Sequence, residues 1–440
     1  MNGIIKELGD GLILRRSRAE DAEALVAFNH KIHAEGEWDG KGLDAWTRDL
    51  ISGKQPNFGV ADFTIVEDTK DHKLVSSMNL ISQIWAYEGV PFGVGRPELV
   101  GTLPEYRRRG LVREQFDLVH QWSAERGELV QVITGIPYYY RQFDYELALN
   151  LGGGRMGYAP GVTALKDDEE EPYHLRAALE TDLALIAELY ELGCKRSPIA
   201  AKWDMALWRH ELLGKDRHNI NMRLLYIIED NRNEPVGFVA VPPIKWGNST
   251  VITAYELKAG VSWVKVTPSV VRWLWQFGEE QAKEQDQKHE RFGLSLGEEH
   301  PAYRVYGEHM PHKRKPYAWY MRVPDLAKFI LKIAPALEVR LEQSLLNEYD
   351  GTLKLNFFRS GLRMTFESGK IIGVENLGTD TLKDCGAEFP GLSFLQILFG
   401  RRSLDEVCYY VADCSVRNDE ARVLLEILFP RKPSNVWGIS

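Results

Sequence analysis

The sequence is poor in the residues and patterns that build metal centres, redox sites and membrane spans. Its 440 residues include only four cysteines, which form no CxxC pair and have no histidine partners at zinc-ligand spacing. No apolar run approaches the ~20 residues that a membrane helix needs, and Met1–Asp10 has no apolar core of a secretory signal. We therefore expect a cytoplasmic protein with no metal, no membrane partner, and reduced thiols at Cys194, Cys385, Cys408 and Cys414.

Positive charge is also in deficit. The formal net charge of −9 at pH 7 argues against nucleic acid as the main partner and is compatible with a cationic amine substrate. The sequence shows no Ser-His-Asp set and no catalytic cysteine pattern, so we expect no acyl-enzyme intermediate. A chain of 440 residues exceeds what one hydrophobic core organises, and we expect about two to four domains.

The stretch Val100–Gly127 carries the most specific chemistry. An apolar strand ends at Val100, and apolar residues recur at helical spacing over Val112–Gly127. Between them lies the run Arg107–Gly110. A glycine at this point lets the backbone turn sharply, so that consecutive amides and a helix N-terminus can face an anion. Guanidinium groups beside those amides suit phosphates, although the tetrapeptide alone is equally compatible with a solvated basic turn.

This run resembles the coenzyme A loop of the GNAT N-acetyltransferase superfamily, in which Arg107, Gly110 and Val112 take the patterned positions. The Arg-Arg-Arg-Gly-Leu block is more similar still to the Eis-type (enhanced intracellular survival) acetyltransferases. The resemblance implies acetyl-coenzyme A (acetyl-CoA) as co-substrate. It implies that the coenzyme is held by Leu99, Val100, Gly101, Arg107, Arg108, Arg109, Gly110, Leu111, Val112 and Arg113.

A tyrosine cluster follows the next predicted strand. The segment Ile136–Tyr145 resembles the second GNAT signature, in which a tyrosine lies near the thioester sulfur. Tyr140 takes that position, whereas in Eis-type enzymes the proposed general acid falls at Tyr145. The sequence leaves the choice between these two tyrosines open. Without the upstream loop, amphipathic packing would be the favoured interpretation of the cluster.

Two smaller expectations concern the segments before the loop. Gly89, Gly93 and Gly95 predict a bulge in the strand that ends near Val100, with unpaired amides that point at a ligand. The polar residues that crowd the end of the first predicted helix, among them His33, are interpreted as a solvated face rather than as metal ligands.

The chain then repeats itself after a glycine-rich and acidic linker. Corresponding residues recur at a constant offset, which predicts a duplicated acetyltransferase-like unit. The second copy lacks the three arginines and their glycine, and we align its Val264–Pro268 with Val100–Pro104. We therefore expect a catalytically silent second unit. The recurring pairs are Leu14 and Leu175, Arg15 and Arg176, Asp21 and Asp182, and Ile65–Asp68 and Ile227–Asp230.

The remainder of the chain has a different character. A helix broken at Pro335 is followed by short strands and later helices, with a capping box at Ser403 and Glu406. This part resembles the sterol-carrier-like domain that ends Eis-type proteins, and ordinary core is favoured over a lipid-carrier role for its apolar residues. We expect a mixed α/β (α+β) fold with two tandem GNAT-like sheets and a sterol-carrier-like α+β domain, divided as 1–155, 172–322 and 323–440.

The resemblance implies an N-acetyltransferase that moves the acetyl group of acetyl-CoA directly to a primary amine in a ternary complex. The amine would be an aminoglycoside-like small molecule or a lysine side chain of a protein, and the sequence does not say which. By the same resemblance the C-terminal carboxylate of Ser440 reaches back as the base, on a tail whose Trp437 indicates docking. The alternative is a non-catalytic scaffold that binds coenzyme A or a lipid. A homo-oligomer is left open.

Overall fold

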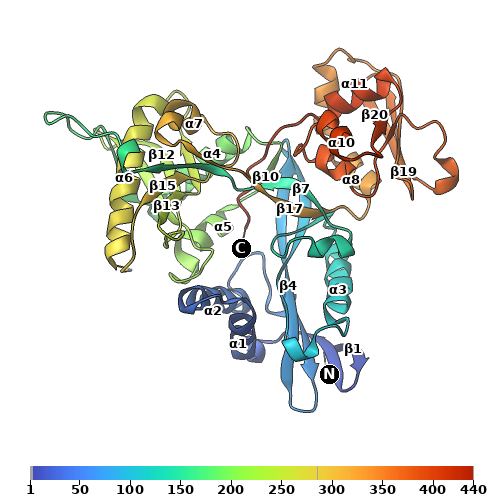
Figure 1. Cartoon of the computed structure of the whole chain (residues 1–440), viewed down its shortest axis with the longest axis horizontal. Coiled ribbons are helices and arrows are strands. Elements are labelled where there is room, and N and C mark those ends of the chain that lie inside the picture. The colour runs from blue at the N-terminus through green and yellow to red at the C-terminus, as the bar shows by residue number, and fades with distance from the viewer. Residues whose placement is uncertain (1–2, 285, 440) are drawn as a thin grey trace.

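Three α/β units meet around a shared centre (Figure 1). The computed structural model describes residues 3–284 and 286–439. The first unit is the blue-to-cyan part of Figure 1, the second is green to yellow, and the third is orange to red. The mixed α/β fold predicted from the sequence is confirmed. None of the helices within the described ranges is long and apolar enough to cross a membrane.

The first unit is built on a long mixed sheet with helices on its faces. The strand order is β1-β2-β3-β4-β5-β6-β17-β7, and β10 also pairs with β4. The amphipathic helix α3 buries Phe116, Val119 and Trp122 against this sheet, as its spacing predicts. The elements are β1 (Ile4–Gly9), β2 (Leu12–Arg16), α1 (Ala22–His33), α2 (Glu37–Ile51), β3 (Phe63–Asp68), β4 (Lys73–Tyr87), β5 (Val90–Thr102), α3 (Leu111–Glu125), β6 (Val130–Ile133), β7 (Glu146–Leu151) and β10 (Ile199–Ala201).

The second unit contains two four-stranded sheets, ordered β14-β12-β11-β9 and β13-β15-β8-β16. Strand β13 pairs in parallel with β15, and β14 leaves that sheet to pair with β12. The elements are β8 (Gly154–Tyr158), β9 (Tyr173–Ala177), α4 (Leu183–Cys194), α5 (Met205–Arg209), a π-helical turn (His210–Gly214), β11 (Leu224–Asp230), β12 (Pro235–Val241), β13 (Ser249–Ile252), β14 (Ala254–Leu257), α6 (Trp263–Glu284), β15 (Arg291–Leu294), α7 (Pro301–Tyr306) and β16 (His312–Arg314).

The first two units exchange strands. Strand β17 (Tyr317–Arg322) lies between β6 and β7 of the first sheet, although it follows the second unit in the chain. In return, β8, which directly follows β7 of the first sheet in the chain, lies between β15 and β16 in a sheet of the second unit. The sheets therefore cross the linear boundaries near residues 155 and 322, and neither sheet is complete without a strand from the other copy.

Each of the two copies contains an equivalent, partly buried ion-pair network. Arg15 contacts Asp21 and Glu67, with both N–O distances at 2.7 Å. Arg176 contacts Asp182 and Glu229 in the same way, at 2.6 and 2.7 Å. In each copy the arginine lies on the strand that precedes the first helix, and it joins this strand to the start of the helix and to the next strand. This equivalence supports the internal duplication read from the sequence.

The alignment of Val264–Pro268 with the strand end of the first copy is wrong. Helix α6 already begins at Trp263 and includes Pro268, and the equivalent strand β14 ends at Leu257. The segment that corresponds in place to the arginine loop is therefore Lys258–Ser262. The β-branched valines of the misaligned segment favour a strand. In the structure Val266, Val270 and Val271 are buried on one face of α6, so tertiary packing overrides that preference.

The third unit is a five-stranded sheet, ordered β20-β19-β18-β21-β22, with helices packed against it. The predicted capping box at Ser403 and Glu406 is confirmed. The predicted break at Pro335 is wrong, because α8 continues through it and the packed face of the helix holds it together. The elements are α8 (Leu326–Glu342), β18 (Gly351–Asn356), β19 (Gly361–Glu367), β20 (Lys370–Leu377), β21 (Ala387–Glu388), α9 (Phe394–Leu398), α10 (Leu404–Tyr410), β22 (Ser415–Val416) and α11 (Asp419–Leu428).

The C-terminal tail, residues 429–439, runs into the centre of the molecule (Figure 1). One continuous hydrophobic cluster includes Trp85 of the first unit, Trp208 of the second, Phe329 of the third, and Val436 and Ile439 of the tail. The tail is thus part of the core that joins the three units. This places the end of the chain beside the first sheet.

Candidate active site

A cleft of about 930 Å³ opens where two strands of the first sheet separate. Strands β5 and β6 pair in parallel at Val94–Val130 and Gly95–Gln131, and no further pair joins them within the described ranges. Beyond these pairs β5 runs on to Thr102. The amides of β5 on that side are therefore free to face a ligand rather than a neighbouring strand.

A bulge lies at the mouth of this separation. Leu99 has a positive φ of 52°, and the register with β4 shifts between Ser77 and Asn79. The bulge predicted for this strand lies at Leu99 rather than at the glycines that suggested it, because Gly93 and Gly95 are regularly paired with β4. Glycine is needed at both positions for another reason, which is the close approach of Glu128. A Cβ at Gly95 would lie 2.4 Å from Glu128 Oε2, and one at Gly93 would lie 3.1 Å from Glu128 Cα.

The predicted phosphate loop forms a left-handed turn at the start of α3. Arg108 has φ 64° and Gly110, the N-cap residue, has φ 77°. The amides of Arg113 and Glu114 donate to the Gly110 carbonyl oxygen at 2.9 and 3.1 Å. The amides before them have no intrahelical acceptor, as at every helix start. Because they face the cleft with the positive end of the helix dipole, they form a site for an anion.

The arginines of the loop stay accessible. Arg109 pairs with Asp10 at 2.9 Å, on a carboxylate whose side chain is 82% exposed. Arg107 donates through Nε to the Thr102 carbonyl oxygen at 3.3 Å, and Arg113 reaches Gln142 at 3.4 Å. These contacts are weak or solvated, so a phosphate can replace them at small cost. All ten predicted coenzyme residues line the one cleft: Leu99, Val100, Gly101, Arg107, Arg108, Arg109, Gly110, Leu111, Val112 and Arg113.

The two candidate tyrosines have different environments. Tyr140, in a 3₁₀ turn (Tyr139–Phe143), lines the cleft and is 3% exposed. Tyr145 is 0% exposed, and its hydroxyl lies 2.9 Å from His120 Nε2. Burial raises the pKa of both tyrosines and lowers the pKa of His120 to about 3. Both phenols are therefore protonated and His120 is neutral at pH 7, but of the two only Tyr140 borders the cleft.

A carboxylate at the cleft is linked to the C-terminal tail. Glu98 lines the cleft and forms an ion pair with Arg96 at 2.6 Å. Arg96 Nη1 also donates to the Ile439 carbonyl oxygen at 3.1 Å, and Gln83 Nε2 donates to the same oxygen at 2.9 Å. The end of the tail is therefore anchored in the first unit, next to the cleft. Ser440 itself lies outside the described residues.

Glu98 is a residue of the cleft that no sequence pattern predicted, and the predicted solvated position of His33 is wrong. His33 does not lie on a solvated face, because it borders the cleft, its Nε2 is buried without a partner among the described residues, and burial lowers its pKa. The described residues contain no cluster of side chains that could hold a metal ion. Glu98 stands one residue before the bulge, so its place next to Leu99 was the available signal.

Comparison with known proteins agrees with this geometry. Residues 27–148 match the family described as acetyltransferase (GNAT) domain. A search of curated protein sequences finds no significant match. Among solved structures, a GCN5-related N-acetyltransferase from Kribbella flavida superposes with a TM-score of 0.65 at 14% identity, over 97% of this chain and 97% of that chain. Eis1 from Mycobacterium abscessus superposes with a TM-score of 0.59 at 13% identity, over 96% and 99% of the two chains.

Residues 27–148 of the first unit therefore match a GNAT acetyltransferase domain, and the solved structures share the fold of the whole chain. The whole chain, in its length and in the arrangement of its three units, is similar to Eis1 and to the Kribbella protein.

Proposed function

We propose that the protein is an N-acetyltransferase that moves the acetyl group of acetyl-CoA directly to a primary amine in a ternary complex. The observation that carries this proposal is the single cleft that joins an anion-binding helix start, a strand bulge and a buried tyrosine. Direct transfer needs these three parts together, and the sequence shows no nucleophile that would form an acyl-enzyme.

In the proposed complex the pyrophosphate lies on the amides of Arg108–Arg113, and the guanidinium groups of the loop hold the remaining phosphate. The pantetheine arm follows the gap between β5 and β6. The acetyl carbonyl accepts a hydrogen bond from an amide of Leu99–Gly101, which stabilises the negative charge of the tetrahedral intermediate as an oxyanion hole does. Acetyl-CoA is the co-substrate, and no metal takes part.

Tyr140 is the proposed general acid. It borders the cleft, and burial raises its pKa above the ordinary value near 10, so that it holds its proton until the thiolate of coenzyme A departs. Tyr145 is proposed to support Tyr140 by packing, since their ring centroids lie 6.4 Å apart and its hydroxyl is engaged by His120.

The proposed base is either the C-terminal carboxylate or Glu98, which is linked to the tail through Arg96. The first candidate is the C-terminal carboxylate, because Ser440 follows directly on Ile439, whose carbonyl oxygen accepts from Arg96. Glu98 is the second candidate because it lines the cleft and shares Arg96. Removal of Ser440 and the Glu98→Gln substitution separate these two roles.

The acceptor is proposed to be an amine-bearing small molecule of the aminoglycoside kind or a lysine of a protein, bound in the cytoplasm. Trp46 and Leu43 of α2 form an apolar wall of the cleft, and Glu98 supplies negative charge for a cationic acceptor. The division into domains 1–155, 172–322 and 323–440, with a sterol-carrier-like third domain, remains part of the proposal.

The test is to follow thiol release from acetyl-CoA against a panel of aminoglycosides, polyamines and lysine peptides. We expect amine-dependent thiol release that is lost in the Tyr140→Phe variant. If coenzyme A binds but no amine in the panel is acetylated, the alternative of a non-catalytic scaffold replaces this proposal.

A further inference from the structure

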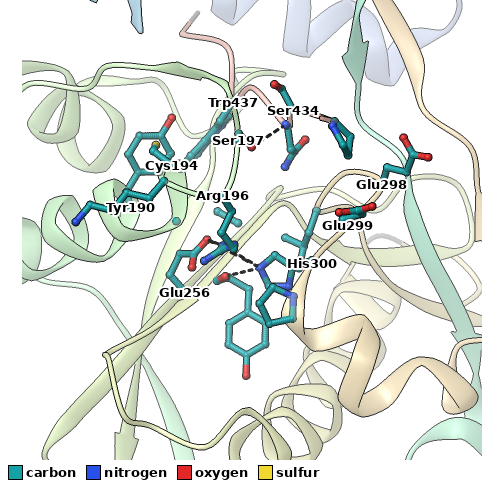
Figure 2. A pocket seen from close by; sticks show the side chains of 18 of the residues that line it. Tyr190, Cys194, Arg196, Ser197, Glu256, Glu298, Glu299, His300, Ser434 and Trp437 are labelled. Carbon is teal, nitrogen blue, oxygen red and sulfur yellow. Dashed lines mark hydrogen bonds and ion pairs between the residues drawn. The ribbon is translucent and has the colours of Figure 1, made fainter. Parts of the chain in front are cut away.

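A second pocket, of about 460 Å³, lies in the second unit at the place that corresponds to the first cleft (Figure 2). The first cleft lies between the end of α1, the bulge of β5 and the segment after β6. The second pocket lies between the end of α4, strand β14 and the segment after β15. Because the two units are copies, these are equivalent sites, but different side chains line them.

At one pair of facing positions, the large side chain and the glycine have changed places between the two units. In the first unit Ile32 of α1 packs on Gly101, where an added Cβ would lie 2.9 Å from Ile32 Cγ2. In the second unit Gly193 of α4 faces Glu256 of β14, and a Cβ at Gly193 would lie 2.2 Å from Glu256 Oε1. A glycine on the helix therefore makes room for a carboxylate at this site in the second unit.

Only one of the two oxygens of the Glu256 carboxylate has a partner among the described residues. The residue is 8% exposed, and its Oε1 pairs with Arg196. Its Oε2 is buried and has no hydrogen-bond partner among the described residues. A buried carboxylate oxygen without a donor is costly, so this atom can accept a donor from a ligand in the pocket.

His300 does not supply that donor. Its Nε2 lies 3.1 Å from the Tyr255 carbonyl oxygen, and its Nδ1 accepts from the amide of Ala302 at 3.2 Å. Its Nε2 lies 3.9 Å from Glu256 Oε1, which is beyond hydrogen-bond distance. Burial lowers the pKa of His300, so it stays neutral and adds no compensating charge. Figure 2 shows Arg196, Glu256 and His300 gathered on one side of the pocket.

The C-terminal tail forms an aromatic wall on another side. Ser434 Oγ accepts from the amide of Ile199 at 3.1 Å, and the amide of Asn435 donates to Ser197 Oγ at 3.3 Å. Trp437 then packs against Tyr190 with ring centroids 6.0 Å apart. Aromatic faces favour organic cations, and of the two further carboxylates on the lining Glu298 is already paired with Arg431 at 2.7 Å.

We propose that this pocket binds a small organic ammonium compound, with Glu256 as its counter-ion and Trp437 and Tyr190 as its apolar wall. Coenzyme A does not fit this site, because the loop Lys258–Ser262 has no arginine and the pocket is half the volume of the first cleft. Lys195, Arg304 and Lys432 also lie on the lining, but the first two are exposed and Lys432 is paired with Glu88 at 3.1 Å. The buried Glu256 oxygen without a partner is an acceptor and therefore selects a ligand that donates a hydrogen bond.

The test uses the full chain labelled with 5-fluorotryptophan, and the ¹⁹F resonance of Trp437 is assigned by its loss in Trp437→Phe. Titration with n-butylammonium chloride at constant ionic strength should shift this resonance saturably. The uncharged probe of similar size, n-butanol, should bind at least about tenfold more weakly, because it lacks the positive charge that strengthens the hydrogen bond of the ammonium group to Glu256. Glu256→Gln should weaken n-butylammonium binding at least about tenfold, while the matched control Glu299→Gln should stay within about twofold.

Equal binding of the two probes to the wild-type protein, or no saturable shift, would overturn the proposal. So would equal losses in Glu256→Gln and Glu299→Gln. The two wild-type titrations decide the matter even if Glu256→Gln does not fold. No acetyl-CoA is present, and an amine in the first cleft does not depend on Glu256, so failure here and failure of the proposed acetyl transfer are distinguishable.

Discussion

The first and second units share an ion-pair arrangement and differ in the loop that precedes the following helix. Arg15 with its two carboxylates in the first unit and Arg176 with its two in the second have nearly identical geometry. The connection to the following helix differs. In the first unit it carries three arginines before Gly110, and in the second it is the short segment Lys258–Ser262. The partly buried ion-pair network is thus common to both units, whereas the arginine loop is present only in the first.

The tail couples the two units. Asn435 contacts the second unit, and Ile439 contacts Arg96 and Gln83 of the first. Removing Ile439 and Ser440 should lower turnover by ~10³-fold or more, since it removes the proposed base and the contact that holds Arg96. Coenzyme binding by calorimetry should stay unchanged. Normal turnover of the truncated protein would return the base to Glu98 or to water.

The two tyrosines test which residue of the first unit reacts. Tyr140→Phe should reduce turnover by ~10²–10⁴-fold with little change in coenzyme affinity. Tyr145→Phe, the matched control, should mainly lower the melting temperature, because its hydroxyl contacts His120 rather than the cleft. Single-turnover kinetics make the comparison at the chemical step. If Tyr145→Phe shows the larger kinetic loss, the assignment is reversed.

A charge reversal in each connecting loop sharpens the contrast between the units. Arg109→Glu should weaken acetyl-CoA binding by about 2–4 kcal/mol, because repulsion replaces a phosphate contact. The same reversal in the second unit, Lys258→Glu, should leave binding unchanged. Both positions are exposed, so neither variant should lose stability. Equal effects of the two reversals in calorimetry would refute a single coenzyme site.

The smallest effect concerns the buried histidine behind the first cleft. His120 has a pKa of about 3 in the folded protein and near 6.5 when unfolded. The unfolded chain therefore binds the extra proton first as the pH falls, and stability is lost from about pH 6.5 down to about pH 3. His120→Gln should reduce this loss by about 1 kcal/mol per pH unit. Parallel melting-temperature curves for the two proteins between about pH 7 and pH 4 would contradict this.

Local chemistry was predictable from the sequence, and long-range pairing was not. The turn at Gly110 and the helix after it depend on neighbouring residues, so the run Arg107–Gly110 was sufficient to predict them. The exchange of β8 and β17 between the sheets depends on partners far away in the chain, which no local pattern encodes.

The same distinction explains the errors at single residues. Pro335 and Pro268 stay inside helices because packing outweighs one lost hydrogen bond. Gly95 looked like a bulge but is small because Glu128 and Ser123 approach its backbone. Glu98 gains its place in the site from Arg96 and the tail, some 340 residues later in the chain, and only the folded structure brings them together.

The central claim is that the first unit alone binds the acyl donor. Calorimetric titration of the full chain with acetyl-CoA tests it directly, with the Arg108→Glu/Arg109→Glu double variant as control. The account predicts one site per chain and no measurable site in the double variant. Two equivalent sites in the wild-type protein, or one site that survives in the double variant, would contradict it.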